Sequence, residues 1–154
     1  YQSPDNERYD LAMVIADGLS TLAIHNNAIA LIDYFQKHSA SCGWRWAPIV
    51  IASQARVALA DEIGEILNSR LSIILIGERP GLSAADSMGI YLTHAPRIGR
   101  TDAQRNCISN IRQIGLSPEK AARQLKVLIS EAFKLGLSGV NLKIKKQSQQ
   151  VITI

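Results

Sequence analysis

The stretch "LSIILIGERPGLS", residues 71–83, determines how the rest of the chain is interpreted. Its first half is a run of apolar β-formers that stops at Gly77, and Glu78 and Arg79 follow at once. A short, continuously apolar run is typical of a strand that is buried on both faces of a parallel sheet. A charged pair is costly to place beside such a strand unless other groups receive it. The stretch therefore raises the question of what lies at this strand end.

Apolar runs elsewhere in the chain predict more strands of the same sheet. Residues 11–18 and 47–53 are almost unbroken apolar segments, and each is expected to form a buried strand. Residues 89–96 alternate enough to predict a fourth strand, whose direction the pattern leaves open. Residues 140–144 are a candidate for a last strand, and residues 97–116 are expected to be a loop with one helical turn.

Helical patterns separate these strands. Ser20 is a suitable cap for a helix that ends near Gly43, and residues 61–68 predict a short helix with acidic residues in its first turn. The clearest helix spans residues 117–139, with a serine cap and a proline in the first turn. Its expected buried stripe consists of Ala121, Leu125, Leu128, Ile129 and Ala132.

Buried strands that alternate with helices predict an α/β fold. We expect a mostly parallel sheet with helices on both faces, which is a Rossmann-like layered domain. The dinucleotide fingerprint G-x-G-x-x-G is absent after the first strand. One domain is expected over residues 1–154, with an irregular tail at 144–154. The chain begins at Tyr1, which is typical of a processed or truncated piece.

The composition of the sequence limits the classes of protein to which the chain can belong. The sequence contains no apolar run of membrane-spanning length and no signal-peptide pattern, and its two cysteines are far apart, which favours a reducing cytoplasm. Residues 1–96 carry 6 basic and 10 acidic side chains, whereas residues 97–154 carry 11 and 3. The basic half is compatible with nucleic acid, a phosphate-bearing ligand, an acidic partner or an ordinary solvated face. Because no RNA-type aromatic motif is present, we expect no nucleic acid.

Three short segments are expected to meet at one edge of the sheet. In open α/β sheets, ligands bind beyond the carboxyl ends of the strands. Residues 16–21, 53–57 and 77–83 all follow predicted strands. Each segment has an ordinary explanation, namely a turn, a solvated Arg56 and a local ion pair between Glu78 and Arg79. Only their convergence predicts a binding site.

Catalytic signatures are missing from the sequence. The segment at 77–83 lacks the Gly-Lys-Ser/Thr ending of a phosphate loop, and no G-x-S-x-G nucleophile elbow occurs. His25, His38 and His94 have no metal-ligand spacing, and a lone Cys107 is more often a small buried hydrophobe than a nucleophile. We therefore expect no catalytic residue and no metal ligand in this chain.

Five strings resemble one family in consistent order from about Leu11 to Lys143. "ADGLST" (16–21), "DEIGEIL" (61–67), "ILIGERPGL" (74–82), "APR" (95–97) and "CISNI" (107–111) are similar to the light, or small, subunit of ethanolamine ammonia-lyase. The resemblance implies a radical lyase that uses adenosylcobalamin to convert ethanolamine to acetaldehyde and ammonia. In that family the large subunit binds ethanolamine, and the light subunit covers the corrin ring from the other side. Light chains of the family are considerably longer at the amino end.

The resemblance places the cobalamin contacts of the family on Val57, Glu78 and Cys107. It also implies a hetero-oligomer in the bacterial cytoplasm or in the microcompartment for ethanolamine use. The cofactor is expected to keep its own base on cobalt, because the Asp-x-His-x-x-Gly motif is absent. The competing hypothesis is a non-catalytic α/β module that binds a nucleotide or another anionic ligand, and a weaker third hypothesis is nucleic-acid binding through residues 97–146.

Overall fold

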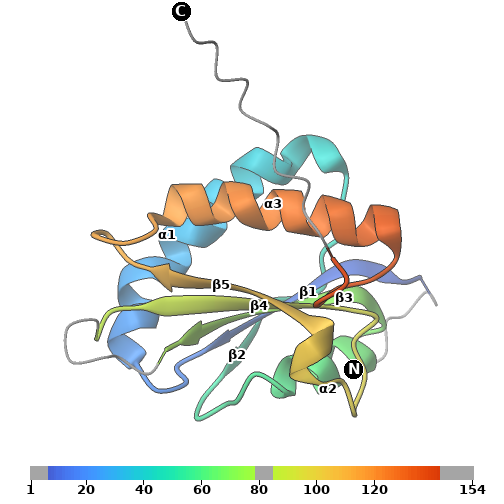
Figure 1. Cartoon of the computed structure of the whole chain (residues 1–154), viewed down its shortest axis with the longest axis horizontal. Helices are drawn as coiled ribbons and strands as arrows, with labels where there is room; N and C mark the ends of the chain where they lie inside the picture. The colour runs from blue at the N-terminus through green and yellow to red at the C-terminus, as the bar shows by residue number, and fades with distance from the viewer. Residues whose placement is uncertain (1–6, 79–84, 143–154) are drawn as a thin grey trace, which may run out of the picture.

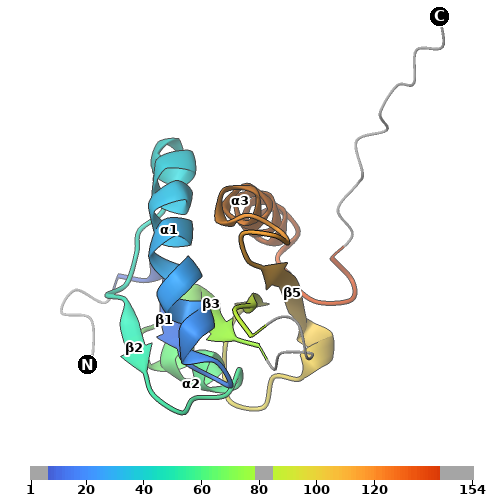
Figure 2. The ribbon, with the colours of Figure 1, turned by 90° about the vertical axis from the view of Figure 1, so that its left-hand side faces the viewer.

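The structure is a computed structural model that describes residues 7–78 and 85–142. It has three layers, in which α1 and α3 cover one face of a sheet and α2 lies on the other (Figures 1 and 2). The strands are β1 (Tyr9–Ala16), β2 (Val50–Ala52), β3 (Ser69–Gly77), β4 (Met88–His94) and β5 (Arg105–Ile111). The helices are α1 (Thr21–Ser39), α2 (Leu59–Ile66) and α3 (Pro118–Leu135), with short 3-10 turns η1 (Ala40–Cys42) and η2 (Asp102–Gln104).

The sheet is mixed and has the order β2-β1-β3-β4-β5. β1 pairs in parallel with β2 and β3, whereas β4 is antiparallel to both β3 and β5. β4 is thus the one strand of this sheet that runs against the others. The predicted α/β class and the helices on both faces are confirmed, and the reversed β4 qualifies the expectation of a mostly parallel sheet.

The two long apolar strands are buried as predicted. In β3 the side chains of Leu71 and residues 73–75 are fully buried, and β1 lies beside it in the centre of the sheet. β2 differs, because only three residues pair and the strand forms an edge. Ile51 in its middle is 81% exposed. The expectation of a second buried strand was therefore wrong about burial.

β5 is a strand where the sequence predicted a loop. η2 supplies the expected helical turn, and residues 105–111 then pair with β4. β5 lies at the other edge of the sheet, and most of its side chains are polar, so it lacks the apolar run of a buried strand. The expected last strand at 140–144 is also wrong as far as it is described, because residues 140–142 form no strand and 143–144 lie outside the described residues.

Helices α1 and α3 form the larger core with the sheet. Each begins at a serine cap: Ser20 Oγ accepts a hydrogen bond from Ala23 N at 3.2 Å, and Ser117 Oγ accepts one from Lys120 N at 3.3 Å. Gly136 caps the carboxyl end of α3 and has a φ of +67°. This left-handed backbone conformation is common at the residue that ends a right-handed α-helix, and glycine adopts it without strain. The predicted stripe of α3 is buried. These helices close one face of the sheet.

Helix α2 covers the opposite face only in part. It packs on β3 and β1, where a smaller apolar cluster includes Val14, Ile74 and Ala60. Ala60 and Gly64 are buried on its inner face, as the predicted amphipathic pattern requires. Because α2 is only 8 residues long, space remains beside it on this face, next to β4 and β5.

Candidate functional site

A cavity of about 970 Å³ lies beside α2 at the carboxyl ends of β1, β2 and β3. The predicted convergence of the three strand-end segments is confirmed for their described residues, since each segment contributes to the wall. The remainder of the third predicted segment, residues 79–83, lies outside the described ranges. The lining consists of Gly18, Leu19, residues 54–58, residues 76–78, Ser87, Tyr91, Asp102, Arg105, Ser109 and Asn110.

Asp17 joins two of these segments. Its Oδ1 accepts a hydrogen bond of 2.7 Å from the backbone N–H of Gln54. Gln54 has a φ of +51°, which side chains adopt only when the surrounding structure holds them there. The acid at the end of β1 therefore fixes the loop after β2, and its role is local structure.

Gly77 allows the turn after β1 to pack against the end of β3. The backbone N–H of Leu19 donates to Gly77 O at 3.1 Å. A Cβ on Gly77 would collide with the carbonyl oxygens of Asp17 and Ser20. Glycine is required at this position because two backbones approach each other closely. The contact places the start of α1 directly at the cavity.

Glu78 is the charged strand end that the sequence left unexplained. Its Oε2 accepts a hydrogen bond of 2.6 Å from Ser87 Oγ and one of 3.2 Å from Asn110 N. The backbone N–H of Glu78 also donates to Ser87 O at 3.0 Å. Two donors from neighbouring segments therefore hold Oε2 of this carboxylate at the cavity wall, while Oε1 lies against Gly89.

Tyr91 forms part of the floor, and Cys107 lies directly opposite it on β5. Burial, followed by the Cys107 thiol and the Glu78 carboxylate, raises the pKa of Tyr91 to about 12. Although Cys107 as a residue is exposed, partial burial of its sulfur is the first cause that raises its pKa, Glu78 raises the pKa further, and a hydrogen bond with Tyr91 opposes the shift. At neutral pH both groups keep their protons. They can donate hydrogen bonds, but neither is prepared to act as an anionic nucleophile.

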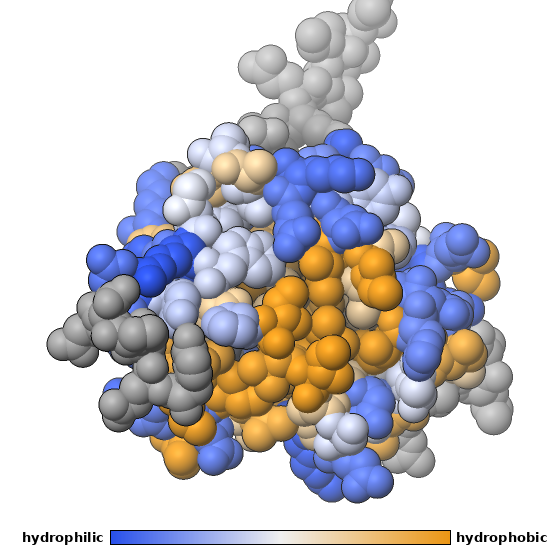
Figure 3. All heavy atoms as spheres, turned by 180° about the vertical axis from the view of Figure 1, so that it is seen from behind, coloured by the Kyte–Doolittle hydropathy of each residue, from blue (hydrophilic) through white to orange (hydrophobic). Residues whose placement is uncertain are grey.

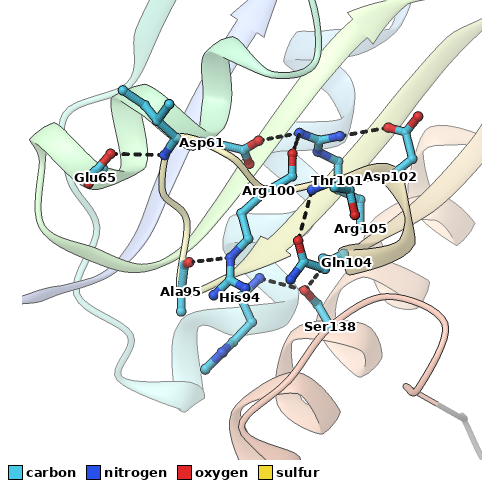
Figure 4. A network of polar contacts seen from close by, with 11 residues as sticks. Asp61, Glu65, His94, Ala95, Arg100, Thr101, Asp102, Gln104, Arg105 and Ser138 are labelled. Carbon is cyan, nitrogen blue, oxygen red and sulfur yellow. Dashed lines mark hydrogen bonds and ion pairs between the residues drawn. The ribbon is translucent and has the colours of Figure 1, made fainter.

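An ion-pair network closes the wall formed by β5 and η2 (Figure 4). Arg105 donates from Nη2 to Asp61 of α2 and to Arg100 O at 3.1 Å, and from Nη1 to Asp102 Oδ1 at 2.7 Å. The side chains of Arg105 and Asp61 are only 7% and 3% exposed. Pairing with Asp61 and Asp102 raises the pKa of Arg105 against the opposing effect of burial. The network ties α2 to β5 across the base of the cavity.

The three residues predicted as cofactor contacts lie in different positions. Val57 and Glu78 line the same cavity, and Val57 packs on the apolar cluster that also contacts Tyr91. Cys107 is exposed on β5 with its thiol next to Tyr91, and it also lines a separate groove between β5 and α3. The structure therefore brings two of the three together and puts the third beside their cavity. The predicted loop position of Cys107 is corrected to a strand.

The histidines are separate from the cavity. His25 and His38 lie on α1, and His94 is at the end of β4 that is remote from Met88 and Glu78. Within residues 7–78 and 85–142, no group of three or more His, Cys, Asp or Glu side chains has an arrangement that holds a metal ion. No helix in the same ranges is long and apolar enough to span a bilayer.

Six polar lining residues were not found from the sequence, and two of them, Ser87 and Asp102, lie in the segments before β4 and β5. Tyr91 belongs to a strand whose pairing was unknown, and Arg105, Ser109 and Asn110 belong to the strand that was interpreted as a loop. A signal was present in the alternation of residues 105, 107 and 109, which places polar side chains on one face of an extended segment. Because the residues on the opposite face are not all apolar, this alternation alone does not predict a strand.

Comparison with known proteins identifies the family. A sequence model described as "Ethanolamine ammonia-lyase light chain (EutC)" matches residues 2–143. A protein of Pseudomonas putida named ethanolamine ammonia-lyase small subunit is 55% identical over 134 residues, which cover 87% of this chain and 49% of that protein.

Two further relatives with the same name have similar sequence identities and coverages. The protein of Xanthomonas campestris is 56% identical over 134 residues, covering 87% of this chain and 49% of its own length. That of Pseudomonas fluorescens is 50% identical over 149 residues, covering 97% and 54%. The chain spans about half the length of these relatives. With the family model matching nearly all of its residues, the chain belongs to the ethanolamine ammonia-lyase light chain family.

Proposed function

We propose that this chain forms the cobalamin-binding part of an ethanolamine ammonia-lyase small subunit. The observation that carries the proposal is the meeting of Val57 and Glu78 in one cavity at the strand ends, beside the predicted contact Cys107. Two of these positions were assigned by the family resemblance and were also selected by the rule that ligands bind beyond strand ends. The agreement of the two arguments supports the assignment.

The cavity suits a wide, mostly apolar ring with amide groups on its rim. Ala55, Val57 and Ile76 supply apolar wall, and a volume of about 970 Å³ is at the upper end of the range for ligand pockets. Glu78 offers carboxylate oxygen to amide N–H groups, and Asn110 and Ser109 add polar contacts. The apolar wall and these polar side chains together thus fit the corrin ring of adenosylcobalamin and its amide groups.

Adenosylcobalamin, when bound, supplies a cobalt–carbon bond whose homolysis starts radical chemistry. The residues of this chain bind and orient the ring from one side. Tyr91 and Cys107 keep their protons at neutral pH, so they contribute packing and hydrogen bonds. Binding energy that holds the corrin in a fixed position can favour the reactive geometry without a catalytic side chain in this subunit.

The partner in this proposal is the ethanolamine ammonia-lyase large subunit. It binds ethanolamine and the adenosyl side of the cofactor, and it completes the enzyme that forms acetaldehyde and ammonia. The relatives are named small subunits, which supports a hetero-oligomer. The bacterial cytoplasm, or the microcompartment for ethanolamine use, is the location that this proposal implies.

The test combines the chain with a large subunit of the family. Co-purification of the two, a cobalamin absorption spectrum in the complex and acetaldehyde formation from ethanolamine are the expected results. Large subunit alone, with cofactor and substrate, is the control. Equilibrium dialysis of the same complex against nucleotides tests the competing hypothesis. Saturable nucleotide binding without a cobalamin spectrum would replace our proposal with the nucleotide-binding module.

A further inference from the structure

A second carboxylate stands at the same cavity as Glu78. Asp102 lies in the turn η2 that precedes β5, and it lines the cavity together with Arg105. The pKa of Tyr91, on the floor, is raised in part by both Glu78 and Asp102, so the phenol lies within electrostatic reach of the two acids. The cavity therefore has a carboxylate on β3 and another on the segment before β5.

Asp102 is held in place although its side chain is 95% exposed. Arg105 Nη1 donates to its Oδ1 at 2.7 Å, and the Arg105 side chain is itself only 7% exposed (Figure 4). A capping box between Thr101 and Gln104 fixes the turn from the other side, with Thr101 N donating to Gln104 Oε1 at 2.9 Å. The carboxylate is thus preorganised by a buried arginine and a capped turn.

Stability does not explain this arrangement. An ion pair with a fully exposed partner contributes little to folding, because water screens the charges. Arg105 already has a buried counter-ion in Asp61, which neutralises its charge. Arg105 nevertheless donates a hydrogen bond to Oδ1 of Asp102, and within the described ranges no group donates one to Oδ2. The arrangement presents a fixed acceptor oxygen at the cavity.

We propose that Asp102 accepts a hydrogen bond from an amide N–H group on the rim of the bound ring, and that Arg105 positions Asp102 for it. The inference rests on the proposed cobalamin-binding function. Glu78 and Asp102 would then contact different parts of one ligand from two segments that are far apart in sequence. Arg105 acts through Asp102 and is a positioning residue, since its own guanidinium is engaged by three oxygen atoms.

The first experiment measures cobalamin affinity in the complex with the large subunit. Asp102→Ala should weaken binding about tenfold, as expected for loss of a hydrogen bond to a charged group. Asp33→Ala, an exposed acid on α1 away from the cavity, is the matched control and should leave the Kd unchanged. Because Asp102 is on the surface, the variant should fold, and circular dichroism checks this. Equal affinity of wild type and Asp102→Ala would overturn the inference.

A second experiment separates a ligand contact from a structural effect. Cobalamin derivatives in which one rim amide is hydrolysed to a carboxylate serve as probes. Wild type should bind one of these isomers at least about tenfold more weakly than cobalamin, because two carboxylates repel each other at close range. Asp102→Asn should lose this discrimination, since its side chain is neutral.

The two hypotheses fail in distinguishable ways. If wild type in the complex binds no cobalamin, the proposed function itself is wrong. If wild type binds cobalamin but Asp102→Asn discriminates among the isomers as wild type does, only the role of Asp102 is refuted. Arg105→Lys should weaken binding in the wild-type background and have no further effect on affinity in the Asp102→Ala background.

Discussion

At the scale of single residues, the position of Glu78 explains the charged end of β3. The carboxylate is received by Ser87 Oγ and Asn110 N, so its placement at the end of a buried strand is compensated by hydrogen bonds. Both of these hydrogen bonds go to Oε2, and Oε1 lies against Gly89, where a Cβ would come within 2.6 Å of it. Under the proposed function, this internally bonded carboxylate would also accept a hydrogen bond from an amide of the ligand.

Glu78→Gln tests whether this carboxylate serves both the internal donors and a ligand. The amide keeps the size of the side chain but has only one acceptor oxygen, so it cannot serve the two internal donors and a ligand amide as the carboxylate does. We expect cobalamin affinity in the complex to fall about tenfold, in line with the strength of hydrogen bonds to charged groups. Isothermal titration calorimetry measures the Kd. Glu62→Gln, on the exposed side of α2, is the control, and an equal loss in both variants would contradict the assignment.

His94 should make stability depend on pH. Burial lowers the pKa of His94 below 6.5, and the nearby Arg70, Arg8 and Arg100 lower it further. The unfolded chain therefore takes up a proton near pH 6.5 while folded His94 is still neutral. The free energy of unfolding should then decrease as the pH falls below 6.5 toward the folded pKa. Urea unfolding at several pH values measures this slope, and His94→Gln should reduce it. Parallel curves for the two proteins would contradict this expectation.

The sequence allowed the position of Glu78 at the cavity to be predicted, whereas contacts that depend on strand register could not be predicted. Glu78 was identifiable because it follows a strongly apolar strand. Tyr91 meets Cys107 only because β4 and β5 pair with these residues opposite each other. Arg105 meets Asp61 only because α2 lies against the same face of the sheet. Neither the register of β4 with β5 nor the packing of α2 on the sheet can be predicted from a local sequence pattern.

At the scale of elements, the contact between the β1–α1 turn and the end of β3 holds one side of the cavity. Gly77→Ala would place a methyl group against the carbonyl oxygens of Asp17 and Ser20, which belong to backbone that cannot easily move. We expect a loss of about 3 kcal/mol in the free energy of unfolding, at the upper end for overpacked sites. Chemical denaturation measures it.

Gly43→Ala provides the comparison. A Cβ at Gly43 meets no atom within 4 Å, so its cost comes only from the φ of +67°. We expect a loss of about 1 kcal/mol for this strain. If Gly43→Ala cost as much as Gly77→Ala, close approach of the two backbones would not be the reason for glycine at the end of β3.

The two edge strands, β2 and β5, show why the sequence did not predict every strand and its burial correctly. Val50 at the start of β2 and Ile49 just before it belong to an apolar run that is typical of a buried strand, yet no strand pairs with the outer edge of β2. In β5, only Ile108 and Ile111 are buried, and a register irregularity near Asn110, with φ of +58°, interrupts the alternation. A run of apolar residues in a sequence shows that the segment is hydrophobic but does not show which strands lie beside it. The same pattern is therefore expected for a buried central strand and for an uncovered edge strand.

At the scale of the whole molecule, unequal coverage of the sheet creates the site. Two long helices close one face, whereas α2 leaves room on the other, where β4 and β5 contribute polar side chains. The ion pair between Asp61 and Arg105 then joins α2 to β5 and completes the wall. The α/β class was predictable from alternating patterns, but this asymmetry depends on helix length and on the reversed β4.

A second consequence of the layout is an apolar surface at the β2 edge. Figure 3 shows apolar residues gathered on the side of the molecule where Figure 2 places β2 and α1. Ile49 and Ile51 near β2 and Leu19 and Leu22 near the start of α1 are exposed. Ile51 pairs in register with Ile15, which is itself only partly buried. An exposed apolar edge strand is a site for unwanted pairing with another chain.

We therefore expect the isolated chain to self-associate through this edge, and Ile51→Lys to suppress the association. A lysine on an edge strand opposes pairing because its charge would have to be buried, and at 81% exposure the change should alter the free energy of unfolding by no more than about 0.5 kcal/mol. Sedimentation velocity over a range of concentrations measures the association. Ile114→Lys, at a site that is 83% exposed in the turn between β5 and α3, adds the same charge elsewhere. If it suppressed association equally, net charge and not the β2 edge would be responsible.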